Sequence, residues 1–186
     1  MALNSAAVFL PAGGHFYRAP EGTPAPSDIL AAPAEPWDEI GHTSLEDILA
    51  WTSEGGEQTV LGTLQAPQLK VSRASRSETF SFNLQQWDAE SLKLYFGQNM
   101  VDVNEDGSLL GVNATPAPTT SALLIVLKDS EQRALGIYAP KAELYRGDDV
   151  SIEGTDSISS LPIQVTPVAY SSNTWAFGII PIQEAE

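Results

Sequence analysis

The residues of this 186-residue chain best suited to chemistry are two histidines and one short acidic run. A histidine can act as a base or bind a metal near neutral pH. His15 and His42 lie in different segments, and neither has a nucleophile or second ligand at a typical spacing. The chain has no cysteine, and the signatures of serine hydrolases, phosphate-binding loops, dinucleotide-binding folds and zinc proteases are missing. The sequence therefore predicts no catalytic residue, no cofactor, no metal site and no enzyme activity.

The acidic run from Asp102 to Gly107 matches the first half of an EF-hand calcium loop. The twelfth position of such a loop should hold a bidentate glutamate, and here it is Asn113. No helical pattern flanks the run on both sides. We therefore interpret Asp106-Gly107 as a tight turn, in preference to a calcium site.

Two further patterns have an ordinary structural explanation. Arg146-Gly147-Asp148 spells an adhesion tripeptide, but it stands between two expected strands, where a turn is required. The four tryptophans and the Phe80/Phe82 pair are also found in sugar-binding platforms. Packing in a core or an interface is the more common use of such rings.

The charge of the chain is strongly acidic and unevenly distributed. It has 24 acidic and 9 basic residues, a net charge of −15. Residues 19–69 and 147–186 contain acids and no Lys or Arg, whereas residues 70–146 are nearly neutral. Such a chain repels DNA and anionic membranes. Its acidity favours either simple solubility or a surface that repels DNA or a like-charged neighbour.

The sequence predicts neither a membrane anchor nor a secretion signal. The longest apolar run, Leu123 to Leu127, is far too short to cross a bilayer. The first residues lack a basic region ahead of an apolar stretch. We therefore expect the protein to be made and used in a cytoplasm.

Residues 1–36 are predicted to form an extended N-terminal arm, and residues 37–186 a β-rich domain. Five prolines between Ala19 and Pro36 prevent a helix or a central strand there. Apolar patches at Val8–Leu10 and Phe16-Tyr17 need a partner surface, either from this chain or from another.

The pattern of the second region is mainly β. Thr43 to Trp51 has a short helical pattern, although a turn fits nearly as well. Asp88 to Phe96 has a capping residue, an apolar face and a following glycine, which predict a helix. Arg73 to Ser77 is polar, as a connection in a β-hairpin should be. Strands are expected in eight stretches: 68–74, 79–84, 109–112, 122–127, 135–145, 150–153, 161–170 and 175–182. Together they predict a β-barrel or a sandwich of two packed sheets with one flanking helix.

The order of several segments is similar to that of a known family. Ala19-Pro20-Glu21-Gly22-Thr23 leads through prolines to Trp37 and Gly41, and Pro140-Lys141-Ala142 and Leu161-Pro162-Ile163 follow much later. This order resembles the major tail proteins, which are the tail tube subunits of long-tailed bacteriophages. The resemblance covers nearly the whole chain, and it depends on the order and spacing of motifs that are individually soft.

The resemblance implies a non-enzymatic virion protein of the phage tail, assembled in the host cytoplasm. Tail tube subunits form hexameric rings that stack into a hollow tube, through which DNA passes without specific binding. An arm and a long loop join neighbouring subunits, and tape-measure and tail terminator proteins are the expected further partners. The expected inter-subunit contacts are Phe16, Tyr17, Pro20, Pro24, Trp37, Glu54 and Glu57. The alternatives are a tail terminator, a capsid decoration protein or a carbohydrate-binding β-sandwich module.

Overall fold

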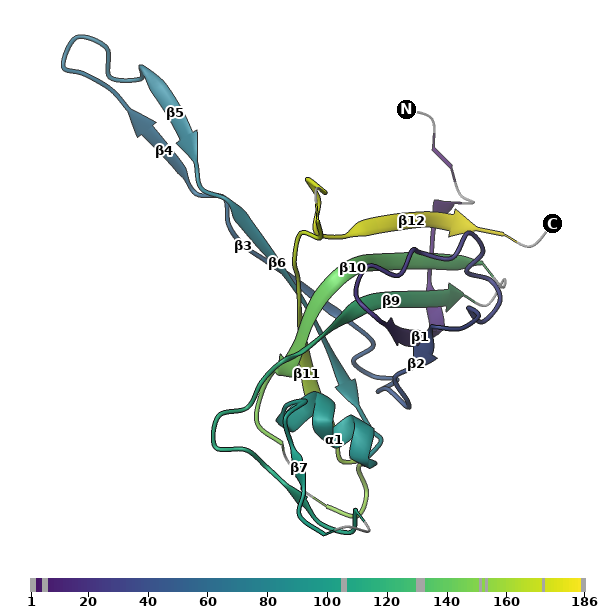
Figure 1. Ribbon diagram of the computed structural model, residues 1–186. Helices are drawn as coiled ribbons and strands as arrows, with labels where there is room; N and C mark the ends of the chain where they lie inside the picture. Colours follow the sequence, from purple (N-terminus) through teal and green to yellow (C-terminus); the bar gives the residue numbers. More distant parts are fainter. Residues whose placement is uncertain are drawn as a thin grey trace.

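The computed structural model describes residues 3–4, 7–104, 107–129, 133–150, 152, 154–171 and 173–184. Within them the chain is mainly β with a single helix (Figure 1). The elements are β1 (Pro11–Ala19), β2 (Asp38–Glu39), β3 (Ala50–Gly55), β4 (Gln58–Leu61), β5 (Lys70–Arg73), β6 (Arg76–Leu84), α1 (Ala89–Phe96), β7 (Val101–Asp102), β8 (Leu110–Gly111), β9 (Thr119–Asp129), β10 (Ala134–Arg146), β11 (Leu161–Pro167) and β12 (Gly178–Gln183).

The main sheet has the strand order β2-β1-β9-β10-β11-β6-β3, and β12 also pairs with β10. Strand β10 is long enough to serve two groups of strands. Along one edge it pairs with β9 from Ala134 to Leu144; along its other edge the first half pairs with β12 and the second half with β11. The β9–β10 register shifts between Ala139 and Ala142, where the partner on the other edge of β10 changes from β12 to β11. The result is a sandwich of packed sheets and not a closed barrel, so the sandwich form of the prediction is confirmed.

Strand β9 is buried on both faces, as its continuous apolar run predicts. Leu123 and Ile125 belong to the core between the sheets, while Leu124 and Val126 belong to a second cluster on the opposite face. The main core is completed by aromatic and aliphatic side chains of β6, β10 and β11 and by α1. The second cluster is closed by side chains from the proline-rich segment, including Ile29.

The N-terminal region is integrated into the chain's own sheet. Strand β1 lies between β2 and β9, and it pairs with β9 in antiparallel register from Pro11 to Ala19. The segment that follows is tied to the same layer, since the Gly22 amide donates to Pro140 O at 2.8 Å and the Ile29 amide to Gln183 Oε1 at 3.0 Å. The proposed division of the chain at residue 36 stays a prediction.

Helix α1 is confirmed with the predicted cap. The Asp88 side chain accepts a hydrogen bond from the Ser91 amide, and Gly97 follows the last helical residue. Leu94 and Tyr95 are buried against the main core. The helix packs on β10 and β11, at the end of the sandwich away from β4 and β5 (Figure 1).

Two local predictions are wrong. Residues 43–51 form no helix, because Ala50 and Trp51 begin strand β3 and Leu45 remains exposed without a core to cover. Residues 73–77 form no hairpin turn, because β5 and β6 run consecutively along one side of a longer hairpin and pair with β4 and β3. The hydrogen bonds and side-chain contacts of the β4–β5 and β3–β6 pairs outweigh the local preference for a turn at this polar stretch.

The other differences are confined to connections. Val150 and Ile152 lie outside any strand, and the remaining residues of the predicted 150–153 strand, Ser151 and Glu153, lie outside the described residues. The expected strand at 109–112 is confirmed in shortened form as β8, which pairs with β7.

Candidate assembly surfaces

A hairpin made of β3–β4 and β5–β6 projects from the sandwich (Figure 1). Every residue of β3, β4 and β5 is exposed. Near its far end Val60 lies directly opposite Val71, and these two side chains are 45% and 52% exposed. The other exposed large apolar side chains of the hairpin are Trp51, Leu61, Leu64 and Leu69. Exposed apolar side chains gathered toward the tip of a projection are typical of a protein–protein contact.

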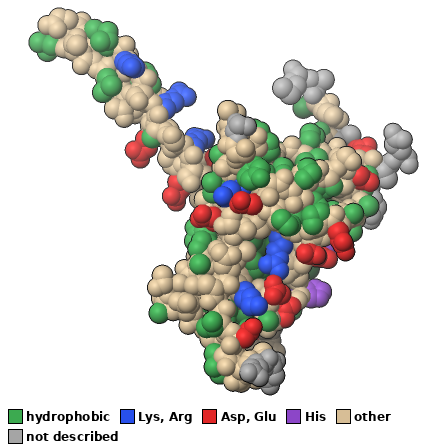
Figure 2. Space-filling model, in the orientation of Figure 1, with side chains coloured by type: hydrophobic (Ala, Val, Ile, Leu, Met, Phe, Trp, Pro, Cys, Tyr) green, Lys and Arg blue, Asp and Glu red, His purple; other side chains and the backbone are tan. Residues whose placement is uncertain are grey.

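The outer part of the same hairpin, residues 58–77, is basic in a chain of net charge −15. Residues 58–77 contain Lys70, Arg73 and Arg76 and no acidic residue. Figure 2 shows basic side chains spaced along the projection and apolar ones at its far end. Residues 58–77 therefore differ from the rest of the acidic chain in both polarity and charge.

The hairpin is fixed where it leaves the sandwich. Trp51 Nε1 donates to Glu78 Oε2 at 2.7 Å, and Ser53 Oγ donates to Glu78 Oε1 at 2.8 Å. These bonds, the one from Trp51 first, lower the pKa of Glu78, because they favour the charged carboxylate. The Trp51 ring also contacts Phe80 and Phe177 edge-on, each at 5.3 Å between ring centroids. These contacts hold the base of the hairpin in one orientation.

A glycine is required at the joint between β3 and β4. Gly55 has a φ of +86°, a conformation that other residues rarely adopt. A Cβ atom there would lie 2.4 Å from Ser75 O on the facing strand. At this joint the end of β3 therefore lies very close to the residues that precede β6, just outside the sandwich.

Exposed apolar side chains also gather at the opposite end of the molecule. Strands β7 and β8 and their flanking loops lie there, beside α1 (Figure 1). The loop after β10 reaches the same end, where the Tyr95 hydroxyl donates to Asp148 O at 2.6 Å. The exposed apolar side chains of these segments are Val101, Val103, Leu109, Val112, Ile152 and Ile158. Among the described residues, exposed apolar side chains therefore gather both on the hairpin and at the far end.

A buried ion pair anchors the two ends of the chain to the β9–β10 connection. Arg133 and Asp129 are 9% and 5% exposed, and Arg133 Nε donates to Asp129 Oδ2 at 2.7 Å. The same guanidinium donates to Val8 O at 2.9 Å and lies 3.9 Å from Glu184. One arginine thus joins the N-terminal segment, the sheet and the C-terminal segment.

The seven expected contact residues divide into two groups. Phe16, Tyr17 and Trp37 are buried in the chain's own core, where they fill the partner surface that the apolar patches required. The exposed members are Pro20, Pro24, Glu54 and Glu57. Their contact with another subunit stays a prediction.

The apolar hairpin residues were missed by reasoning from sequence. Val60-Leu61 and Leu69–Val71 flank a stretch that contains Gly62 and Pro67, which is a signal for a hairpin turn. Their exposure had no signal, because alternating apolar residues in a strand normally predict a buried face.

The described part of the chain contains no group of three His, Asp or Glu side chains that could hold a metal. His15 Nδ1 lies 2.6 Å from Glu39 Oε1, as an exposed pair. Two residues of the EF-hand-like run, Glu105 and Asp106, lie outside the described residues. Among the described helices, none has the length and apolar character needed to span a membrane.

Comparison with known proteins assigns the family. The profile of the phage tail tube protein family matches residues 1–180. The chain belongs to this family. It is also 32% identical to the major tail protein Gp23 of Mycobacterium phage L5 over 178 residues, which cover 89% of this chain and 87% of the relative. The major tail protein Gp23 of Mycobacterium phage D29 matches to the same extent. The resemblance drawn from segment order is confirmed: the chain is a structural protein of a phage tail and not an enzyme.

Proposed function

We propose that this chain forms hexameric rings that stack into the tail tube, through which phage DNA leaves the virion. The family supports self-assembly into a tail tube. The hexamer, the stacking contacts and the passage of DNA are our proposals.

The observation that carries the proposal is the exposed apolar hairpin. A side chain such as Leu64, which is 93% exposed, would be covered when the hairpin contacts another copy. The second apolar surface lies at the other end of the molecule, beside α1 (Figure 1). Two different surfaces at opposite ends favour a head-to-tail contact, which generates an open assembly and not a closed pair. Stacked rings are such an assembly.

The acidity of the chain suits a conduit for DNA. DNA carries about one negative charge per 1.7 Å of its axis, so a wall of like charge repels it and does not hold it. The acidic residues are concentrated in residues 19–69 and 147–186. We propose that these segments supply much of the repulsion, and that DNA passes without specific binding.

Tape-measure and tail terminator proteins are the further partners we propose, since a tube of defined length needs a template and an end. We propose assembly in the host cytoplasm. The chain has no cysteine, so contacts between its copies depend on packing and not on disulfides. A terminator or decoration protein would share a β-rich fold, but an exposed stacking surface at each end favours the tube subunit.

Negative-stain microscopy of the purified full-length chain tests the proposal. We expect rings and tubes at high concentration, with a tape-measure template added where the chain alone does not nucleate. A protein that stays monomeric under both conditions and is absent from virions would contradict the proposal.

A further inference from the structure

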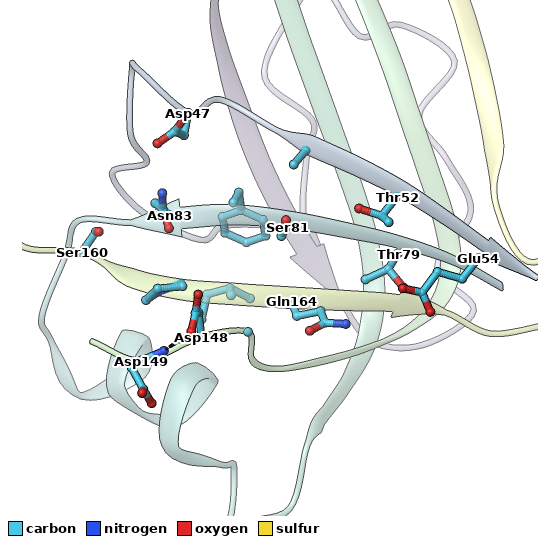
Figure 3. A pocket seen from close by; sticks show the side chains of 15 residues that line it. Asp47, Thr52, Glu54, Thr79, Ser81, Asn83, Asp148, Asp149, Ser160 and Gln164 are labelled. Carbon is cyan, nitrogen blue, oxygen red and sulfur yellow. Dashed lines mark hydrogen bonds between the residues drawn. The ribbon is translucent and has the colours of Figure 1, made fainter. Parts of the chain in front are cut away.

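The solvent face of β3, β6 and β11 forms an open trough of about 630 Å³ (Figure 3). The side chains on its floor can be derived from the alternation of inward and outward residues along β6. Phe80, Phe82 and Leu84 of β6 enter the core, so Thr79, Ser81 and Asn83 face outward. Thr52 of β3 and Gln164 of β11 widen the same polar floor. The floor therefore offers hydroxyl and amide groups to a partner instead of apolar surface.

The rim of the trough is acidic. Asp47, Glu54, Asp148 and Asp149 line it, and Figure 3 shows Asp148 and Asp149 on one side with Asp47 and Glu54 on the other. Arg146 pairs with Asp149 and neutralises that carboxylate. In the described part of the chain no Lys or Arg lies within ion-pair distance of the remaining three carboxylates.

Residues 58–77 of the hairpin carry charge of the opposite sign, whereas its base holds Glu54, Glu57 and Glu78. Arg73 and Arg76 line one hollow at its joint together with Gly56 and Gln58. Both residues are exposed, and neither forms an ion pair with a described residue. Arginine pairs well with carboxylates because its planar donors match the two oxygens.

A hairpin cannot fill the trough of its own molecule, because it points away from the body (Figure 1). From Gly55 to Leu61, the last residue of β4, it extends about 20 Å at the rise of a β-strand. That reach suffices to contact a second molecule. In a chain of net charge −15, bodies repel one another, and the segment 58–77 is the part that an acidic surface attracts.

We infer that the acidic trough of one copy receives the basic side of the hairpin of a second copy. In this contact Arg73 and Arg76 of the second copy pair with Asp47, Glu54 and Asp148. The apolar residues toward the hairpin tip extend past the trough to the body of the receiving copy. This inference rests on the proposed tube, and it names the surface that the hairpin binds and the charge that selects it.

Charge reversal and its rescue test the contact in the full-length chain. The variants are Arg73→Glu, Asp148→Lys and the pair combined, with Asp47→Lys as a second trough variant. Asp38→Lys is the matched control, because Asp38 is exposed on β2 and lies outside the trough. Circular dichroism and the thermal midpoint establish that each variant is folded.

We expect each single reversal to raise the protein concentration needed for tube formation at least tenfold. The concentration needed by the combined variant should return to within threefold of that of the unmodified chain. The concentration needed by Asp38→Lys should also stay within threefold of it. Single reversals that assemble normally, or a combined variant no better than either single one, would overturn the trough contact while leaving the tube intact. Failure of the unmodified chain to form tubes would instead overturn the proposed function.

Discussion

Trp51 and Glu78 join the two strands of the hairpin at its base, where the indole nitrogen donates to the carboxylate at 2.7 Å. The bond sets the direction in which the hairpin leaves the sandwich. It depends on the charged form of Glu78, whose pKa it lowers.

Acid should therefore loosen the base of the hairpin. Because the folded chain lowers the pKa of Glu78, this contribution to stability is complete above the ordinary value near 4.5. It is lost as the pH falls through the lowered pKa. The indole N–H resonance of Trp51, followed by nuclear magnetic resonance, should shift in that window. In Glu78→Gln the shift should disappear, whereas in Glu54→Gln it should remain; a shift that persists in Glu78→Gln would refute the assignment.

Replacing Val71 by Lys should block assembly without unfolding the chain. Val71 is half exposed opposite Val60, so its loss changes stability by no more than about 0.5 kcal/mol. A buried charge at a stacking contact should reduce tube formation at least tenfold, measured by pelleting and microscopy. Thr59→Lys, on the neighbouring position of β4, is the control for added charge. Normal tubes from Val71→Lys would show that this surface is not part of the contact.

Arg133→Met should destabilise the chain by about 3 kcal/mol, because it leaves the Asp129 carboxylate without its guanidinium in a buried site. Arg146→Met removes an exposed pair with Asp149 and should cost no more than about 0.5 kcal/mol. Urea unfolding of both variants gives the comparison. Equal losses in the free energy of unfolding would show that burial does not set the strength of the ion pair between Arg133 and Asp129.

The cap of α1 should be worth about 1 kcal/mol, the usual cost of replacing such a residue by alanine. Asp88→Ala should lose that amount, whereas Asp88→Asn should retain most of it, since an amide oxygen also accepts from the Ser91 amide. The Ser91 amide lowers the pKa of Asp88, so the cap weakens as the pH falls below about 3.8. The difference in stability between the original chain and Asp88→Ala, measured by thermal unfolding, should therefore be smaller near pH 3. A difference that does not change with pH would contradict the assignment of the cap.

Much of the fold could be predicted from local patterns. The continuous apolar run in β9 indicated a strand covered on both faces, and Asp88 and Gly97 marked the ends of α1. The patch Phe16-Tyr17 was recognised as needing a partner, but whether this chain or another supplied it depends on tertiary packing. Strand β1 enters the sheet beside β9, and the chain itself buries them.

The exposure of the hairpin could not be predicted from its pattern. Val71 alternates with polar neighbours just as Phe82 does, yet Val71 is exposed and Phe82 is 3% exposed. Period-two alternation indicates a face that needs covering but not which molecule covers it. The trough was hidden for a related reason, since Asp47 and Asp148 are about 100 positions apart and meet only across β6 and β11.

A cryo-microscopy reconstruction of tubes assembled from the full-length chain is the most direct test of the central claim. The account predicts stacked rings of six copies in which each hairpin contacts a copy in the next ring and covers Val60, Leu64 and Val71. Tubes whose hairpins point into solvent, or particles that close after one ring, would contradict it.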